Sequence, residues 1–459
     1  MKKRYKKECV TLIVTSFLIG CAADVKPTTS PEQNERVSLE TFSSPSSPER
    51  KTPKPISLYD AANLVIAYHP KVAQAISSEK GEEEMINIAK AGYYPQVKGG
   101  MSFGYDHNSD KNDNDQVRSL DLEVQQTLYD FGKTSNSVKS AEYGYQSARA
   151  KTESTNEELI HSATAAVINS VRYQKLIKLT QQQVAQVSSL VNLIEDRQAQ
   201  GASNLSDVLH VRSRLDEVQS EELDTRTQYQ IQLQNLHYLT GVPTELGATI
   251  EELPEVFDQI CATPINWEEI PEYIIADIEA KRALAEFELS KSEEKPTISL
   301  SGIASHDFNK NRAPSYNSRM DSRISLNVSV PIYQGGGLAA KKRAAENWAR
   351  ASEARKEEIR IDINRVISDS QVNLQNMQNR RDLLIRRVNN LKGTRELYKK
   401  QYLDLGTRSL VDLLNSEQEF HRAQVDVENN KLDIIQTKLS CAFYHGKLDE
   451  YFSPSQTSN

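Results

Sequence analysis

The chain has 459 residues, of which 38% are hydrophobic and 26% are charged, and its formal net charge is −7 at pH 7. A chain of this length can bury a large core, and its low hydrophobic content suits long helices with much exposed surface. The acidic balance and the scattered basic residues argue against a nucleic-acid surface, so we expect no DNA or RNA partner.

The N-terminus has the order of a secretory signal. Residues 2–7 are rich in lysine and arginine, and residues 10–19 form an apolar run too short to cross a bilayer. Residues 18–21 read Leu-Ile-Gly-Cys, which resembles the lipobox of bacterial lipoproteins. That resemblance implies a signal peptide over residues 1–20 and an acylated Cys21, and the alanine that follows favours sorting to the outer membrane. The alternative is an ordinary signal with a cysteine nearby by chance.

Residues 21–56 then form a tether. Prolines, serines, threonines and glutamates dominate residues 26–55, a composition that cannot bury a core and predicts disorder. From residue 57 to residue 91 the apolar positions follow a helical period.

Two pairs of segments alternate apolar and polar residues, and each pair predicts two strands. The first pair covers residues 96–106 and 120–125, with a polar loop at 107–118 between them, and the second covers residues 298–301 and 324–330. The strands have about the ten residues needed to cross a bilayer at a tilt, although a soluble sandwich alternates in the same way. Four strands are too few to close a barrel, so several chains would have to share one.

Two long runs without proline, residues 133–200 and 338–405, predict helices of roughly 100 Å each. Shorter helices over residues 206–239 and 410–441 would return beside them, with a glycine at each hairpin tip, Gly201 and Gly406. Apolar residues at heptad-like spacing predict coiled-coil seams, at Val184, Val187, Val191 and Ile194 in the first run and at Met377, Leu384, Leu391, Tyr398 and Leu405 in the second.

The chain is internally duplicated. Residues 201–209 and 406–414 share a glycine, a leucine four positions on, an aspartate six on and a leucine eight on, and residues 128–132 are echoed by 332–336. A period close to half the chain indicates two copies of one unit. We therefore expect a first repeat, a linker, a second repeat and a polar tail, at residues 57–243, 244–264, 265–452 and 453–459.

No enzyme motif is complete. Gly132, Lys133 and Thr134 resemble the end of a phosphate-binding loop, but Thr127 stands where that motif needs glycine. The eight histidines have no metal-ligand spacing, so we expect no catalytic, cofactor or metal site. Three of them are expected to face solvent on helices: His161, His210 and His421.

Cys261 and Cys441 would be the only thiols of the mature chain. In an oxidising envelope they could form a disulfide, or both could be buried free thiols.

Taken together, these elements resemble the TolC family of outer-membrane channels, most specifically at residues 128–132, 332–336 and 406–412. The resemblance implies an α+β membrane protein: a homotrimer with four strands per chain in one 12-stranded β-barrel, continued by a barrel of coiled-coil helices in the periplasm. It implies a passive exit duct in the outer membrane of a Gram-negative bacterium. The duct would be opened by a periplasmic adaptor and an ATP- or proton-driven inner-membrane pump, and would serve type I protein secretion or multidrug efflux. The alternative is a lipid-anchored coiled-coil structural protein or adhesin, which would not need the strands.

The resemblance also implies a periplasmic gate. Asp412 matches a residue of an acidic ring at the constriction. Arg408 matches an arginine that links the helices, and Asp207 matches the acidic partner of that arginine. Arg408→Ala is therefore expected to raise leakage through the closed channel. Both aspartates could instead be first-turn carboxylates that stabilise a helix N-terminus.

Two positions depart from the family's gate. Asn415 stands where the family has a second ring acid, and Leu403 where it has a linking tyrosine, with Tyr402 one residue earlier. The adaptor is expected to dock at the tips, Gly201 and Gly406.

Overall fold

The computed structural model describes residues 54–108, 113–244, 247–251, 253–308 and 320–452. The predicted signal peptide, Cys21, nearly all of the tether and the polar tail lie outside these residues. Within them the chain forms two units of the same order, each a helix, two strands, a long helix and a returning helix.

The first unit contains α2 (Leu58–Tyr68), α3 (Pro70–Lys90), the short η1 (Ala91–Tyr93), β1 (Gln96–Asn108), β2 (Asp113–Tyr129), α4 (Lys133–Ala199) and α5 (Leu205–Thr240). The second contains α7 (Pro271–Glu293), β3 (Thr297–Asp307), β4 (Met320–Ser329), α8 (Gly337–Lys400), the π-helical η3 (Gln401–Leu405), α9 (Leu410–Tyr444) and α10 (Leu448–Phe452). Between them lie α6 (Val256–Gln259) and η2 (Ile260–Ala262). Among the described residues, no helix combines the length and the hydrophobicity needed to cross a membrane.

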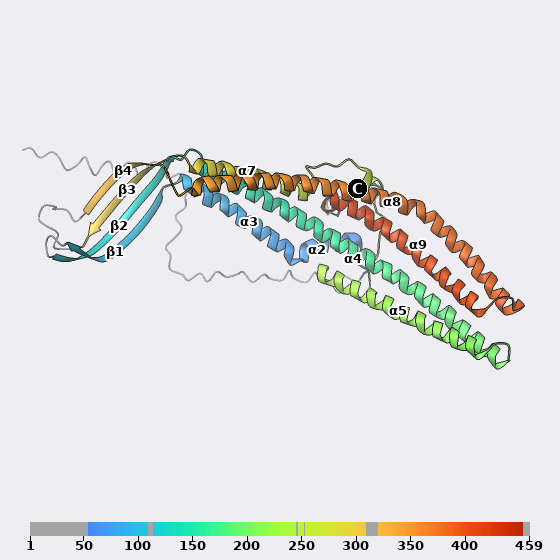
Figure 1. Cartoon of the computed structure of the whole chain (residues 1–459). Helices are drawn as coiled ribbons and strands as arrows, with labels where there is room; N and C mark the ends of the chain where they lie inside the picture. The colour runs from blue at the N-terminus through green and yellow to red at the C-terminus, as the bar shows by residue number, and fades with distance from the viewer. Residues whose placement is uncertain (1–53, 109–112, 245–246, 252, 309–319, 453–459) are drawn as a thin grey trace, which may run out of the picture. The chain divides into compact units, whose positions relative to one another are not determined.

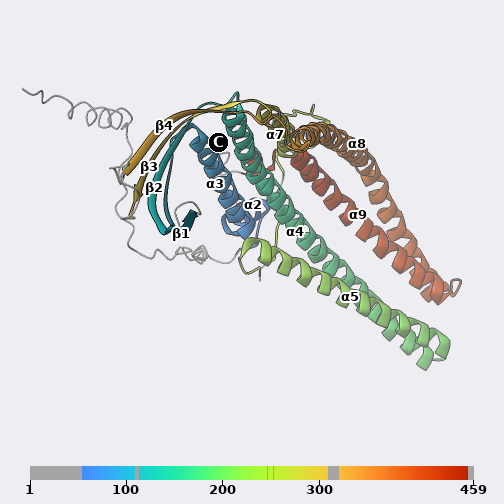
Figure 2. The ribbon, with the colours of Figure 1, turned by 60° about the vertical axis from the view of Figure 1, so that its left-hand side comes forward.

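The long helices pack in two antiparallel hairpins. Helix α4 lies beside α5, and α8 lies beside α9 (Figure 1). Helix α4 also packs against α9, and thereby joins the two hairpins, as Figure 2 shows from a second side. Val187, Val191 and Ile194 are buried along α4, which confirms the predicted seam there.

The four predicted strands are confirmed and form one antiparallel sheet in the order β1-β2-β3-β4. The polar loop predicted at residues 107–118 is mostly wrong, because β1 continues to Asn108 and β2 begins at Asp113, with Asn108 opposite Asp113. Continuous backbone pairing of β1 with β2 outweighs the low strand preference of the asparagines and aspartates in this segment.

One face of the sheet is apolar and exposed. Val97 pairs with Val124 and Leu300 with Leu326, and all four side chains are exposed. Polar side chains of neighbouring strands bond to one another, as Asn327 Nδ2 of β4 does when it donates to Ser301 Oγ of β3 at 2.8 Å. The sheet therefore presents its apolar residues outward and satisfies polar groups internally.

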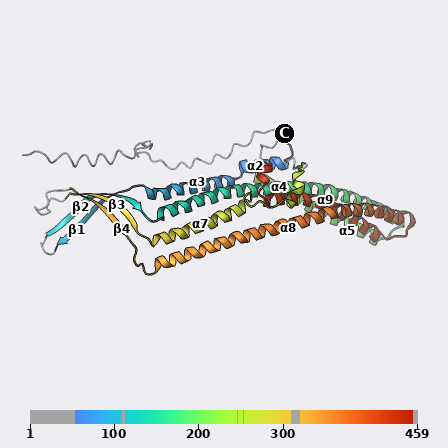
Figure 3. The same ribbon diagram turned by 90° about the horizontal axis from the view of Figure 1, so that it is seen from above.

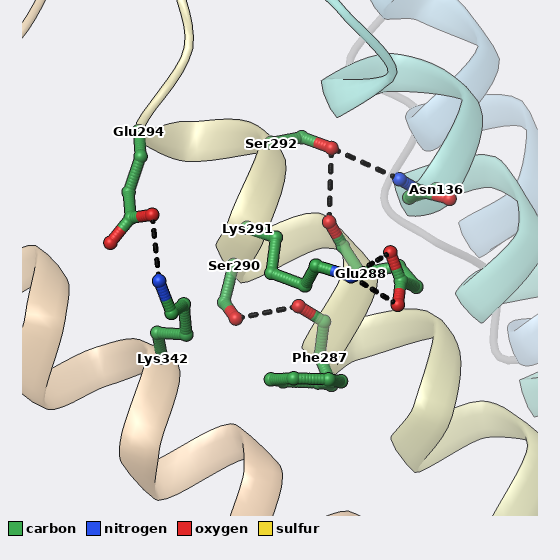
Figure 4. A network of polar contacts seen from close by, with 8 residues as sticks. All are labelled: Asn136, Phe287, Glu288, Ser290, Lys291, Ser292, Glu294 and Lys342. Carbon is green, nitrogen blue, oxygen red and sulfur yellow. Dashed lines mark hydrogen bonds and ion pairs between the residues drawn. The ribbon is translucent and has the colours of Figure 1, made fainter.

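Helix α7 lies between α4 and α8, as Figure 3 shows (α4 green, α8 orange). At the C-terminal end of α7, polar contacts join it to both neighbours (Figure 4). Asn136 Nδ2 donates to Ser292 Oγ at 3.2 Å, and Lys342 Nζ donates to Glu294 Oε2 at 2.9 Å. These contacts fix the spacing of the helices that lead out of the strands.

The main hydrophobic core joins α2, the middle of α4, the linker, α9 and α10. Cys261 of the linker and Cys441 of α9 form a disulfide here, with their Cα atoms 5.2 Å apart. Of the two possibilities left open by the sequence, the structure thus has the disulfide, which ties the segment between the repeats to the last long helix.

Candidate gate at the hairpin tips

Both tips turn at the predicted glycines. Gly201 has φ +76° and Gly406 has φ +61°, a left-handed conformation that costs glycine little. At the first tip Ala202 N donates to Arg197 O at 2.7 Å, and at the second Thr407 N donates to Gln401 O at 3.1 Å. Each turn therefore satisfies a carbonyl group near the end of the helical segment that it follows.

At the second tip Asp412 lies in the first turn of α9 and takes part in a capping box. Ser409 N donates to Asp412 Oδ2 at 3.4 Å, and Asp412 N donates to Ser409 Oγ at 3.1 Å. Arg408 lies beside it, with Nη1 3.9 Å from Asp412 Oδ2 and Nε donating to Gln401 Oε1 at 3.2 Å. The guanidinium also stacks on the Tyr398 ring, 4.4 Å from its centroid.

At the first tip Asp207 occupies the matching position in α5. Its amide donates to Asn204 Oδ1 at 2.8 Å, and its carboxylate accepts from Ser203 Oγ at 2.8 Å. Within this chain Arg408 pairs with Asp412 of its own hairpin, and the expected link between Arg408 and Asp207 stays a prediction. The capping geometry holds each aspartate in the first turn of its own helix, where the dipole favours a negative charge.

A cluster of apolar side chains packs the two tips of one chain together. Its members come from α4, α5, η3 and α9 and are Leu190, Val191, Ile194, Val208, Val211, Tyr402, Leu410, Leu413 and Leu414. Tyr402 is buried in it, whereas Leu405, predicted to extend the seam of α8, is exposed.

The cause is the π-helical turn of η3. One residue more separates Gly336 from Gly406 than separates Gly132 from Gly201, and the π turn takes up that extra residue. The insertion rotates the end of the helix, which carries Leu405 out of the seam. The unequal spacing of the glycines indicates this extra residue, which the heptad pattern alone does not show.

Arginines of both long helices connect the hairpins, a role that their positions in the sequence do not reveal. Arg197 of α4 donates from Nη1 to Leu403 O at 3.4 Å, and its guanidinium lies 5.3 Å from the Tyr402 ring centroid. Arg395 of α8 donates from Nη1 to Gln186 Oε1 of α4 at 3.4 Å. The main-chain carbonyl at position 403 thus takes part in the tip contacts although its side chain is not tyrosine.

Arg395 is also the partner of a largely buried acid. Its Nη1 lies 3.5 Å from Glu417 Oε2 of α9, and its guanidinium lies 4.3 Å from the Phe420 ring centroid. Burial raises the pKa of Glu417, and the positive charge of Arg395 opposes that rise. Farther from the tips, Arg172 of α4 lies 2.7 Å from Asp433 Oδ1 of α9. Charged contacts thus join α4 to the second hairpin at several levels.

The prediction that three histidines face solvent is right for His210 only. His161 stacks on Phe443 at 4.8 Å and lies 3.1 Å from Ser440 Oγ, and His421 is buried between helices. Neighbouring helices cover both rings, which the pattern of a single helix does not show. The described part of the chain holds no group of three or more potential metal ligands suited to a metal ion.

Comparison with known proteins agrees with this architecture. The family model described as outer membrane efflux protein matches residues 61–242 and 275–446, more than half of the chain. The alkaline protease secretion protein AprF of Pseudomonas aeruginosa is 22% identical over 423 residues, which cover 86% of this chain and 85% of AprF. The outer membrane protein TolC of Escherichia coli is 22% identical over 421 residues, covering 86% and 84%.

Two solved structures are similar in fold. The outer membrane channel CmeC of Campylobacter jejuni superposes with a TM-score of 0.74 at 14% identity, covering 93% of this chain and 94% of CmeC. The outer membrane protein VceC of Vibrio cholerae has a TM-score of 0.74 at 18% identity, covering 85% and 96%.

Proposed function

Because this chain belongs to the outer membrane efflux protein family, it is an outer-membrane channel of a tripartite export system, not an enzyme, and we propose that it acts as a trimer gated at its hairpin tips. Channels of this family form trimers and work with an adaptor and an inner-membrane pump. One observation mainly supports a trimer: α5 of the first repeat and α8 of the second both have exposed apolar residues that no other part of the described chain covers.

Leucines at equivalent positions of the two repeats differ in their exposed fraction. Leu410 and Leu414 of α9 are 3% and 8% exposed, because α4 of the first repeat covers them. Their counterparts Leu205 and Leu209 of α5 are 63% and 59% exposed. By the same repeat geometry, α8 of a second copy would cover α5, since α8 corresponds to α4.

Helix α8 and the sheet support this arrangement. Helix α8 carries exposed apolar residues along its length, namely Ile361, Val372, Leu383 and Leu397. The edge strands β1 and β4 each have one neighbour within the chain. Unpaired backbone groups are costly in lipid, so β4 of one copy would pair with β1 of the next. Three copies would then share a closed ring of twelve strands.

In the proposed gate, the resting state is closed by the contacts between the two hairpins of each chain. Arg197, Arg395 and the tip cluster hold α8 and α9 against α4. An adaptor that binds at Gly201 and Gly406 opens the duct only if it binds the open state more tightly than the closed one. Substrate then passes without chemistry in the channel.

Asp412 is proposed to set ion selectivity at the entrance. Its side chain is partly exposed beside Arg408 at the start of α9. Three copies around an axis would concentrate negative potential in a narrow neck and favour cations. With Asn415 in place of a second acid, the ring would be weaker than one built from two acids per chain.

We further propose that Cys21 is acylated and anchors the channel in the outer membrane, on the strength of the charged, apolar and lipobox segments in that order. Protein secretion is the cargo class we favour, because the similar AprF is named for secretion of an alkaline protease. A neighbouring gene for an ATP-driven exporter would support it, and one for a proton-driven drug pump would favour multidrug efflux.

Planar-bilayer recording of the purified protein tests the channel and the selectivity together. We expect a small cation-selective conductance, and a severalfold lower cation preference in Asp412→Asn. Asp382→Asn, which removes an exposed charge from α8, should keep the wild-type preference. Equal selectivity in all three proteins would refute the role of Asp412, and a protein without conductance would favour the structural alternative.

A further inference from the structure

A pocket of about 500 Å³ lies between the two hairpins, on the side where α5 and α9 face each other across α4. Gln183 of α4 and three acids of α5 line it, together with His421 and Arg422 of α9; the acids are Glu217, Glu221 and Asp224. Spacings of four and three residues place the acids on one face of α5.

The pocket has an excess of negative charge. Glu217 is paired with Arg214, whose Nη1 lies 2.5 Å from Glu217 Oε2. Within the described part of the chain, Glu221 and Asp224 form no ion pair. With the Gln418 amide turned so that its oxygen faces both guanidinium groups, it accepts from Arg214 Nη1 at 3.3 Å and from Arg422 Nη2 at 2.6 Å. Arg422 is thus held by a neutral amide and keeps its positive charge, so the three acids exceed the two arginines, Arg214 and Arg422, by one charge.

Two buried polar atoms at the pocket also lack partners. Gln183 and His421 are each 4% exposed, and Gln183 Oε1 and His421 Nε2 make no hydrogen bond within the described residues. A buried polar group without a hydrogen bond destabilises the site, so a ligand that donates to both atoms would bind more tightly. Burial, followed by the charge of Arg214, lowers the pKa of His421 to about 4, so the ring is neutral near pH 7 and Nε2 can accept a hydrogen bond.

We propose that this pocket binds a small organic polycation with primary ammonium groups. One ammonium group would lie between Glu221 and Asp224, and another would donate to Gln183 Oε1 and His421 Nε2 after a small turn of the amide and the ring. The volume suits a flexible organic molecule, since such pockets measure about 300–1,000 Å³. A single metal ion fits less well, because the described residues offer no group of three suitable ligands.

The bound molecule would connect the hairpins. Its carboxylate partners belong to α5 of the first hairpin, and its partner His421 belongs to α9 of the second. Binding would therefore favour the arrangement in which the hairpins lie together. That this arrangement is the closed channel rests on the proposed function, whereas the binding itself does not.

Calorimetric titration of spermidine into the full-length protein in detergent, at constant ionic strength, tests the site. We expect saturable binding that weakens by about tenfold or more in Glu221→Gln/Asp224→Asn and in Gln183→Met, a loss of about 1.4 kcal/mol. Asp216→Asn removes an exposed charge of α5 that does not line the pocket, and it should bind like the wild type. Hydrogen exchange should slow on spermidine addition in residues 217–224 and 418–422.

Equal weakening in Asp216→Asn would show diffuse charge attraction and overturn the site, as would absence of binding or protection confined to other segments. Conductance recorded without spermidine separates the two proposals. A conducting protein that binds no spermidine would refute only the site, and a protein that binds spermidine but conducts no ions would refute only the channel.

Discussion

The two hairpin tips have nearly the same local structure and very different surroundings. Each has a left-handed glycine, an N-terminal cap and an aspartate in the first turn of the returning helix. Leu410 and Leu414 of the second tip are buried, whereas Leu205 and Leu209 of the first are exposed. The duplicated sequence therefore determines the turn, and the position of each repeat determines what its helix contacts.

The second tip also differs by the π-helical turn that buries Tyr402. π-Helical insertions are often found at functional sites. Here the insertion places an aromatic ring under Arg197 of the other hairpin. The second tip, which has the π-helical turn, is thus the tip whose side chains pack against the other hairpin of the same chain.

Removing the Tyr402 ring should have the largest effect on the second tip. Tyr402→Ala is expected to lower the free energy of local opening by about 4 kcal/mol, because it leaves a cavity in the tip cluster and removes the contact with Arg197. Hydrogen exchange of the amides in residues 398–414 measures this. Tyr402→Phe keeps the ring and should behave like the wild type, and similar exchange in the alanine variant would show that the ring does not hold the tip.

Leucine substitutions test the difference between buried and exposed copies. Leu413→Ala should lower the free energy of local opening by about 3 kcal/mol, since Leu413 is fully buried within the chain. Leu209→Asp should leave exchange within the chain nearly unchanged and instead dissociate the trimer, measured by native mass spectrometry.

Gln219→Asp, at an exposed polar position of α5, provides the control for the added charge. A trimer that persists in Leu209→Asp would contradict the assignment of α5 to the subunit interface.

A smaller, pH-dependent effect is expected far from the tips, at Glu157 of α4. Its carboxylate accepts from Leu448 N at 3.0 Å and Asp449 N at 2.8 Å, and burial raises its pKa from 4.5 to about 7. The folded state then binds a proton more tightly than the unfolded state, so stability is fully present below about pH 4.5 and falls by about 3 kcal/mol as the pH rises to 7.

Exchange of the α10 amides between pH 4.5 and 7, corrected for intrinsic rates, measures this loss. Glu157→Gln cannot ionise and should remove the dependence. An equal dependence in this variant would assign the effect to other groups.

The sequence predicted the parts of the fold that depend on local periodicity. The long helices follow from proline-free runs such as residues 133–200, and the tips follow from Gly201 and Gly406. The four strands follow from the alternation of apolar and polar residues. Their lengths do not, because backbone pairing with β1 extends β2 into a polar segment.

The candidate site was harder to predict because its contacts join distant segments. Asp207, Arg408 and Asp412 lie at the tips as expected, but capping holds Asp412 beside Arg408 in one hairpin. Arg197 and Arg395 resemble ordinary polar residues of a long helix until the second hairpin packs on them. His421 was misplaced for the same reason.

Single-channel conductance of Arg197→Gln tests whether contacts between the hairpins keep the channel closed. Arg212→Gln is the matched control, because Arg212 pairs with Glu195 inside the first hairpin at 2.6 Å. We expect low conductance in the wild type and in Arg212→Gln, and a severalfold higher conductance in Arg197→Gln. Equal conductance in all three proteins would contradict a gate held by contacts between the hairpins.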